Sequence, residues 1–315
     1  MPAYVRMLLA GFATLPLAGA AERDIAKTFA VQPGCTLQVD SYRGRLTVEE
    51  GDTAEVAVAI HLETGVEAGP EAERIFAALQ LELKAEGNVV SVRARNPDQT
   101  RVRWFWEEEK QIELYYRITV PRQCSVNLTV GTGSITVGNL AGRHTARVRN
   151  GNISFKRIDG AVDARTGMGS VIVSRCSGAV TVQTREGVIR VGTIGGFADL
   201  RNGSGEIEVL QAKAGIVAVA EAGDISVGFP DDLGQENSVT VSGGSIFAKI
   251  DAAANCSVDA ASVWGHVESK LPLTVETGGL GKRKLTAKLN AGGPVITLRA
   301  SGGDVKIAKL DFDLD

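Results

Sequence analysis

The sequence has 315 residues, including 37 Gly, 9 Pro and only 5% aromatic residues, and 44% of it is hydrophobic. Its 34 Lys and Arg against 37 Asp and Glu give a formal net charge of −3, which excludes the strongly basic character typical of nucleic-acid-binding proteins. Gly without a three-residue period excludes collagen, and the apolar content excludes disorder. This composition indicates a folded chain with many tight turns.

Residues 1–20 predict a secretory signal peptide. Arg6 supplies the positive charge, Met7 to Leu17 form a nearly apolar stretch, and Ala18-Gly19-Ala20 is a small-residue cleavage site. The apolar stretch is too short to span a bilayer, and no later stretch approaches the ~20 apolar residues that a spanning helix needs. We therefore expect an exported protein, periplasmic, cell-surface or secreted, with no integral membrane segment after cleavage.

Residues 21–122 predict strands interrupted by a helix and a hairpin. A helix is expected over 70–78, with Glu71 and Glu73 in its first turn, and a hairpin around Gly87-Asn88. A further strand, IELYYRITVPR, ends the region. We expect this excursion to cap a stack of strands, because an open end is an exposed sheet edge.

Residues 123–270 contain a regular internal repeat. Segments of the form Gly-x-apolar-x-apolar recur every 18 residues, at Gly133, Gly151, Gly169, Gly187, Gly205 and Gly223. Alternation with period 2 predicts strands with one buried face, and the longer period predicts that like strands stack ~4.8 Å apart. One coil cannot bury its apolar face, but a stack can. The predicted fold class is all-β, a single-stranded β-helix (β-solenoid) of 18-residue coils, expected to be right-handed, with a small helix and hairpin as N-terminal cap.

The repeat loosens towards the C-terminus. The interval lengthens to 21 residues at Gly244 and Gly265, and residues 271–315 contain closely spaced strand-like segments. We expect these segments to form a β-meander that closes the stack.

Four segments carry a resemblance to a known family. They are TFAVQPGCTLQVDSYRGRLTV, YRITVPRQCSVNLTVGTGSITV, the GSITV-type repeats and GGPVITLRASGGDVKI. In these segments the chain resembles the bacterial putative-adhesin family of exported β-strand-repeat domains of unknown function. The resemblance covers nearly the whole chain after residue 20 and implies a single-stranded β-helix on an exported or surface-exposed protein. It brings no catalytic residues.

Three of the four cysteines occupy equivalent places in the repeat. Cys35, Cys124 and Cys256 each lie nine residues before a corner Gly. If the segment between the first two loops out, their strands become neighbours with Cα atoms ~5 Å apart, which suits a disulfide in an exported protein. We predict a Cys35–Cys124 disulfide and expect Cys176 to be a small core residue. Three dispersed His and no C-x-x-C motif argue against zinc, so no metal or cofactor is predicted.

Acidic pairs on the outer face give the enzymatic alternative. Glu206 and Glu208 share a strand face roughly 7 Å apart, a separation compatible with an inverting glycosidase pair. Arg190 on the neighbouring coil favours a plain cross-strand ion pair with Glu208 instead. Glu206 and Asp224 share an outward column that could hold one cation, although two solvated carboxylates are favoured. We predict no enzymatic activity, with a carbohydrate-active β-helix enzyme as the alternative.

Two features are candidate interaction sites. The first is an outward basic column, Arg147, Arg165 and Arg201, interrupted by Gln183, with Arg149 and Arg185 two residues further along. This column could meet an anionic glycan or an acidic protein face, or could serve only solubility.

The second is aromatic, Trp104, Phe105 and Trp106 in a loop followed by Tyr115, and either contacts a partner or covers the first coil. Trp264 is expected in the core or as edge cover. The predicted function is a non-enzymatic adhesin or interaction scaffold of the cell envelope or surface, with a protein or glycan partner and no nucleic acid. A role in envelope sensing or signalling is a further alternative.

Overall fold

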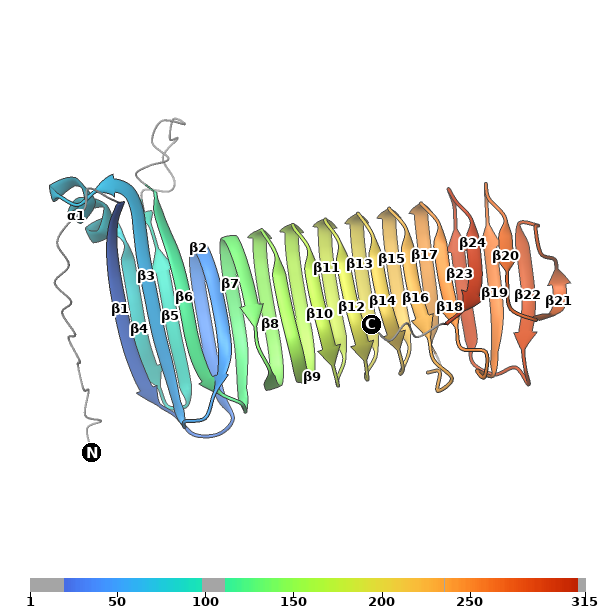
Figure 1. Cartoon of the computed structure of the whole chain (residues 1–315), viewed down its shortest axis with the longest axis horizontal. Coiled ribbons are helices and arrows are strands. Elements are labelled where there is room, and N and C mark those ends of the chain that lie inside the picture. The colour runs from blue at the N-terminus through green and yellow to red at the C-terminus, as the bar shows by residue number, and fades with distance from the viewer. Residues whose placement is uncertain (1–19, 98–110, 235, 311–315) are drawn as a thin grey trace.

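The computed structural model describes residues 20–97, 111–234 and 236–310, which form 24 strands and one short helix. The strands stack along the long axis of the molecule (Figure 1). The signal peptide predicted over residues 1–20 lies outside the described residues, apart from Ala20. The predicted all-β solenoid is confirmed.

Each regular coil contributes two strands, one to each of two parallel ladders. The first ladder contains β10 (Val171–Cys176), β12 (Ile189–Ile194), β14 (Ile207–Ala212), β16 (Ile225–Phe229) and β18 (Ile246–Ile250). The second contains β11 (Val180–Glu186), β13 (Ala198–Ser204), β15 (Ile216–Ala222) and β17 (Asn237–Gly243). From Val171 to Ile189 to Ile207 the register advances by the 18 residues of the sequence repeat.

The first coils are made of longer strands. These are β2 (Cys35–Gly51), β7 (Cys124–Val137), β8 (Leu140–Asn150) and β9 (Ile153–Met168). β2, β7 and β9 each bend through a corner and take part in both ladders. The stack therefore begins with continuous turns of chain and becomes separate strands further along.

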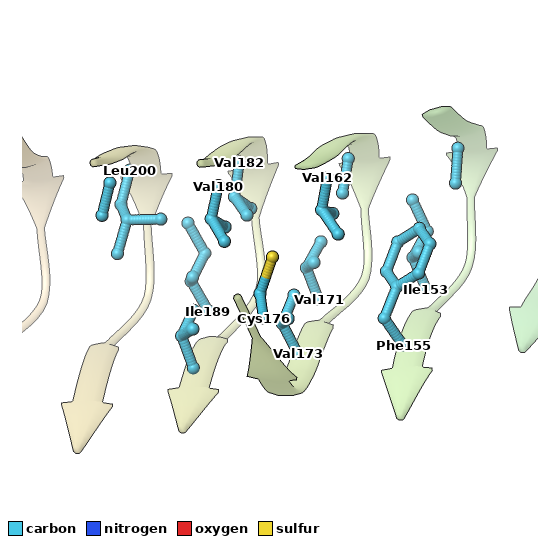
Figure 2. Close-up of a cluster of buried hydrophobic side chains, with 14 of the residues drawn as sticks. Ile153, Phe155, Val162, Val171, Val173, Cys176, Val180, Val182, Ile189 and Leu200 are labelled. Carbon is cyan, nitrogen blue, oxygen red and sulfur yellow. The ribbon is translucent and has the colours of Figure 1, made fainter. Parts of the chain in front are cut away.

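The core lies between the two ladders. Ile153, Val171 and Ile189 lie above one another on successive coils, and all three are fully buried (Figure 2). Burying a side chain of this size stabilises the fold by about 1.5–3 kcal/mol. Cys176 is buried with its thiol 3.0 Å from the carbonyl oxygen of Gly160, so the prediction of a core cysteine is confirmed.

Glycine is required at one corner of every regular coil. Gly151 has φ +138°, and a Cβ built there would lie 1.6 Å from the carbonyl oxygen of Gly133 on the preceding coil. Gly169 stands in the same relation to Gly151. Because the corners stack directly on one another, no side chain fits between them, which explains the repeat of Gly at period 18.

The N-terminal cap extends both ladders outward from β2. One side adds β6 (Ile112–Pro121), β3 (Glu55–Glu67) and β1 (Ala20–Ala30), and the other adds β5 (Val89–Arg95) and β4 (Gln80–Glu86). Helix α1 (Pro70–Ala78) lies at this end of the stack (Figure 1). Its buried face is Ala72 and Phe76. β6 and β5 run parallel to β2, whereas β3, β1 and β4 are antiparallel to their neighbours.

The C-terminal end differs from the expected meander over residues 271–315. β21 (Thr274–Gly278) and β22 (Lys284–Leu289) form an antiparallel hairpin that covers β19 (Cys256–Ser262). β23 (Val295–Ala300) instead lies between β17 and β19, and β24 (Val305–Lys309) lies between β18 and β20 (Val267–Ser269) (Figure 1). The last coil is inserted within the stack because its apolar residues Ile296, Leu298, Val305 and Ile307 are buried there between two parallel neighbours.

Candidate functional site

The predicted basic column lies on the outer face of the second ladder. Arg147 of β8 lies opposite Arg165 of β9, which is followed on the next coils by Gln183 and Arg201. The residues on either side of each arginine in the chain point inward, so these guanidinium groups share one outer surface. The structure therefore brings together the three arginines that the sequence placed in one column.

Two aspartates accompany this column. Asp163 binds Arg165, with 3.1 Å between Oδ1 and Nε, and also lies 4.0 Å from the guanidinium of Arg147. Asp199 binds Arg201, with 2.9 Å between Oδ1 and Nε. All these groups are partly exposed, so each pair contributes at most about 1 kcal/mol to stability. The aspartates reduce the repulsion between stacked arginines and hold their side chains in place.

A second arginine column lies two residues further along the same strands. Arg149 and Arg185 are exposed, and neither forms an ion pair within the part of the chain that the structure describes. They are two coils apart, about 10 Å at the usual strand spacing. These two residues are the least neutralised cations of the two columns.

Glycines separate the arginines of this second column. Gly167 lies between Arg149 and Arg185, and a Cβ at Gly167 would lie 2.5 Å from the carbonyl oxygen of Arg149. Gly203 has the same relation to Arg185. The backbones of neighbouring coils therefore approach too closely here for any residue but glycine. As a result, no side chain lies between Arg149 and Arg185 in this column.

Together these residues line a hollow of about 740 Å³ along the face. We call this surface the arginine face. It consists of Arg147, Arg149, Arg165, Arg185 and Arg201 with the polar and glycine residues between them. The carboxylates of Asp163, Asp199 and Glu221 lie on or beside it, and its five arginines outnumber these three groups. Such a surface attracts anionic groups.

Tyr115 is the residue of the predicted aromatic site that the structure describes, and it does not lie on the arginine face. Trp104, Phe105 and Trp106 lie outside the described residues, so whether they contact a partner remains a prediction. Tyr115 is half-buried on β6 of the cap, in the other ladder. Trp264 is 75% exposed, so the expectation that it covers an edge or enters the core is wrong. It lies just after the end of β19, where its backbone pairs with Ser301 and its ring is left in solvent.

Cys35 and Cys124 lie directly opposite each other on β2 and β7, as the repeat predicted. Both are buried free thiols, and the Cys124 thiol donates a hydrogen bond to the carbonyl oxygen of Ser125. Burial raises the pKa of both groups, so the thiolate that would start oxidation is scarce in the folded protein. The disulfide between them stays a prediction.

Of the acidic residues considered for catalysis or for a cation, Glu208 and Asp224 have structural partners. Glu208 binds Arg190 with 2.7 Å between Oε2 and Nε, which confirms the predicted cross-strand ion pair. Asp224 accepts a hydrogen bond from the backbone N–H of Ser245 on the next coil. Within the described ranges, no three His, Cys, Asp or Glu side chains come together as a metal site, and no helix has the length and apolarity to cross a membrane.

The architecture is that of a β-solenoid with a charged outer face. The sequence profile of the family Toastrack DUF4097 matches residues 78–308, and the chain belongs to this family. None of the curated proteins compared with it matches.

Solved structures of similar architecture have low sequence identity to the chain. One is described as a putative adhesin from Bacteroides fragilis NCTC 9343, with 15% identity, a TM-score of 0.35, and coverage of 90% of this chain and 97% of that one. Another, described as a putative lipid binding protein from Parabacteroides distasonis ATCC 8503, has 11% identity, a TM-score of 0.40, and coverage of 91% and 97%. Both likenesses are too distant to assign a function.

Proposed function

We propose that this protein is a non-enzymatic interaction module, exported to the cell envelope or surface, that binds an anionic partner through the arginine face. The partner is an acidic glycan or an acidic protein surface. The flat ladder serves as a rigid support, because each arginine is fixed in register by the coils on either side. Rigid presentation reduces the entropy lost on binding.

One observation carries the proposal. Arg149 and Arg185 lie exposed in the same hollow, and among the described residues neither has a carboxylate partner, whereas Arg147, Arg165 and Arg201 are held by aspartates. Arginines that served only solubility would not need to line one hollow together. Guanidinium groups held on a rigid surface favour bidentate recognition of carboxylate, sulfate or phosphate groups.

The test is binding to immobilised polyanions. We expect the protein to bind polygalacturonate or heparin but not neutral dextran, and the affinity should fall as salt screens the charges. The double variant Arg149→Gln/Arg185→Gln should bind about tenfold or more weakly, a loss of roughly 1.4 kcal/mol.

Arg157→Gln/Arg175→Gln is the matched control. These two arginines are exposed on neighbouring coils of the other ladder, so the variant removes the same charge from a different face. It should bind as the unmodified protein does. Equal losses in the two double variants would show that net charge alone matters, and no binding to any polyanion or acidic protein would refute the proposal.

A further inference from the structure

A second hollow, of about 490 Å³, lies on the outer face of the N-terminal cap. Four side chains from four strands line up across it, because β1, β3, β6 and β2 pair side by side. Asp24 lies opposite His61, His61 opposite Tyr115, and Tyr115 opposite Arg45. These residues are distant in the sequence, and the strand pairing alone brings them into one row.

The neighbouring row creates the space. Ala26, Ala59 and Thr47 have small side chains, and Arg117 lies between Ala59 and Thr47 in this row. The hollow is therefore bordered by Tyr115 and His61 on one side and by Arg117 on the other. Its floor is sheet whose inward residues, including Ile60 and Tyr116, are buried.

His61 presents a hydrogen-bond acceptor to this hollow. Its Nδ1 lies 2.8 Å from Oδ1 of Asp24. A carboxylate can only accept a hydrogen bond, so Nδ1 carries the proton, and Nε2 of the neutral ring is left as an acceptor. Its ring centroid is 5.9 Å from that of Tyr115. An acceptor beside a half-buried aromatic ring suits a ligand with hydroxyl groups and an apolar ring face.

Two cations lie towards the β2 end of the hollow, Arg45 on β2 and Arg117 on β6. The Arg45 guanidinium lies 5.7 Å from the centre of the Tyr115 ring, and neither Arg45 nor Arg117 makes an ion pair with any residue that the structure describes. Asp24 lies at the opposite, β1 end of the hollow, and Glu113 on the far side of the row is paired with Arg43 at 2.6 Å. A ligand would therefore be oriented, with its anionic group towards the arginines and its hydroxyl groups towards His61.

We infer that this hollow binds one sugar unit that carries a carboxylate, a hexuronate residue at an end or within a short oligosaccharide. Its carboxylate lies against Arg45 and Arg117, its ring against Tyr115, and one hydroxyl donates to Nε2 of His61. This site is separate from the arginine face, lies in the other ladder, and does not depend on the function proposed for that face.

The test is titration of the protein with trigalacturonate and with neutral galactotriose, followed by calorimetry. We expect the acidic trisaccharide to bind at least tenfold more tightly. Arg117→Gln and Tyr115→Ala should each weaken it by tenfold or more, whereas Tyr115→Phe should retain binding, since the phenyl ring is kept. Circular dichroism spectra and thermal midpoints of all variants verify that they are folded.

Arg157→Gln/Arg175→Gln removes two exposed cations that lie in neither hollow, and this variant should bind trigalacturonate as tightly as the unmodified protein. Loss of binding in this variant, with Arg117→Gln unaffected, would overturn the inference. Equal affinity for the neutral trisaccharide would also overturn it. Tighter binding of galactose 1-phosphate than of galacturonate would overturn the assignment of a carboxylate.

Discussion

The regular coils and the N-terminal cap use the same two ladders, but they build their surfaces in different ways. In the coils, residues that meet are 18 positions apart, so the outer face repeats along with the core. In the cap, antiparallel β3 and β1 bring together residues such as Asp24, His61 and Tyr115 that share no period. The coils therefore give an extended charged surface, and the cap gives a compact hollow lined by acidic, basic and aromatic side chains.

This difference shows which positions of the sequence the fold constrains. In the coils, the stacked corners and the buried columns fix Gly and apolar residues, whereas outward positions are free to vary. Arg149 and Arg185 alternate with glycines whose backbone approach leaves no room for a side chain. In the cap, few positions are repeated, and pairing between distant strands determines which side chains meet.

The largest effect is expected at the corner glycines. Gly151→Ala would place a Cβ 1.6 Å from the carbonyl oxygen of Gly133, so two coils must separate. We expect a loss of about 4 kcal/mol or more in the free energy of unfolding, measured by urea denaturation. Gly87 in the cap hairpin also has positive φ, at +57°, but nothing lies within 4 Å of an added Cβ. Gly87→Ala should cost only about 1–2 kcal/mol, and equal losses at the two sites would contradict the comparison.

A disulfide between Cys35 and Cys124 would link β2 to β7, the strands that precede and follow β3 to β6 of the cap in the chain. We predict that protein folded under oxidising conditions contains it and gains about 2–4 kcal/mol over the Cys35→Ser variant. Mass mapping of a non-reduced digest measures it directly. Because burial raises the thiol pKa values, protein folded under reducing conditions should oxidise slowly. Two free thiols after oxidative folding would exclude the disulfide.

The core and the register of the coils could be predicted from the sequence because a period of 18 leaves little choice of partner for each strand. The column of Arg147, Arg165 and Arg201 followed directly from that register. Insertion of β23 and β24 within the stack could not be predicted, because their alternation of apolar and polar residues would fit next to any coil equally well. The row from Asp24 to Arg45 was missed because it depends on antiparallel pairing between four separate segments, and only Tyr115 was noted.

His144 is a histidine buried within the coils. It lies between Val126 and Val162 in the ladder, is fully buried, and neither ring nitrogen has a hydrogen-bond partner in the described structure. Burial lowers its pKa from 6.5 to about 4. The unfolded chain therefore takes up the proton first, so stability is complete above pH ~6.5 and falls by up to about 3 kcal/mol as the pH drops to ~4.

His144→Val removes this dependence, since valine continues the column. The measurement is the unfolding free energy of both proteins at pH 7 and pH 4.5, where their difference isolates His144 from the titrating carboxylates. His61→Gln in the cap is the control, because that ring is partly exposed and bonded to Asp24. If the unmodified protein and His144→Val lose stability in parallel, His144 does not carry the effect.

The smallest effects are expected at surface ion pairs, where coil and cap should behave alike. Arg190 and Glu208 of neighbouring coils pair at 2.7 Å, and Arg23 of β1 and Glu73 of α1 pair at 2.6 Å. Because all four side chains are more than a third exposed, water and salt screen each pair, and double-mutant cycles should give about 0.2–1 kcal/mol for either. A coupling well above this in the coils alone would mean that the ladder orders its outer side chains as firmly as its core. The arginine face would then be more rigid than exposure suggests.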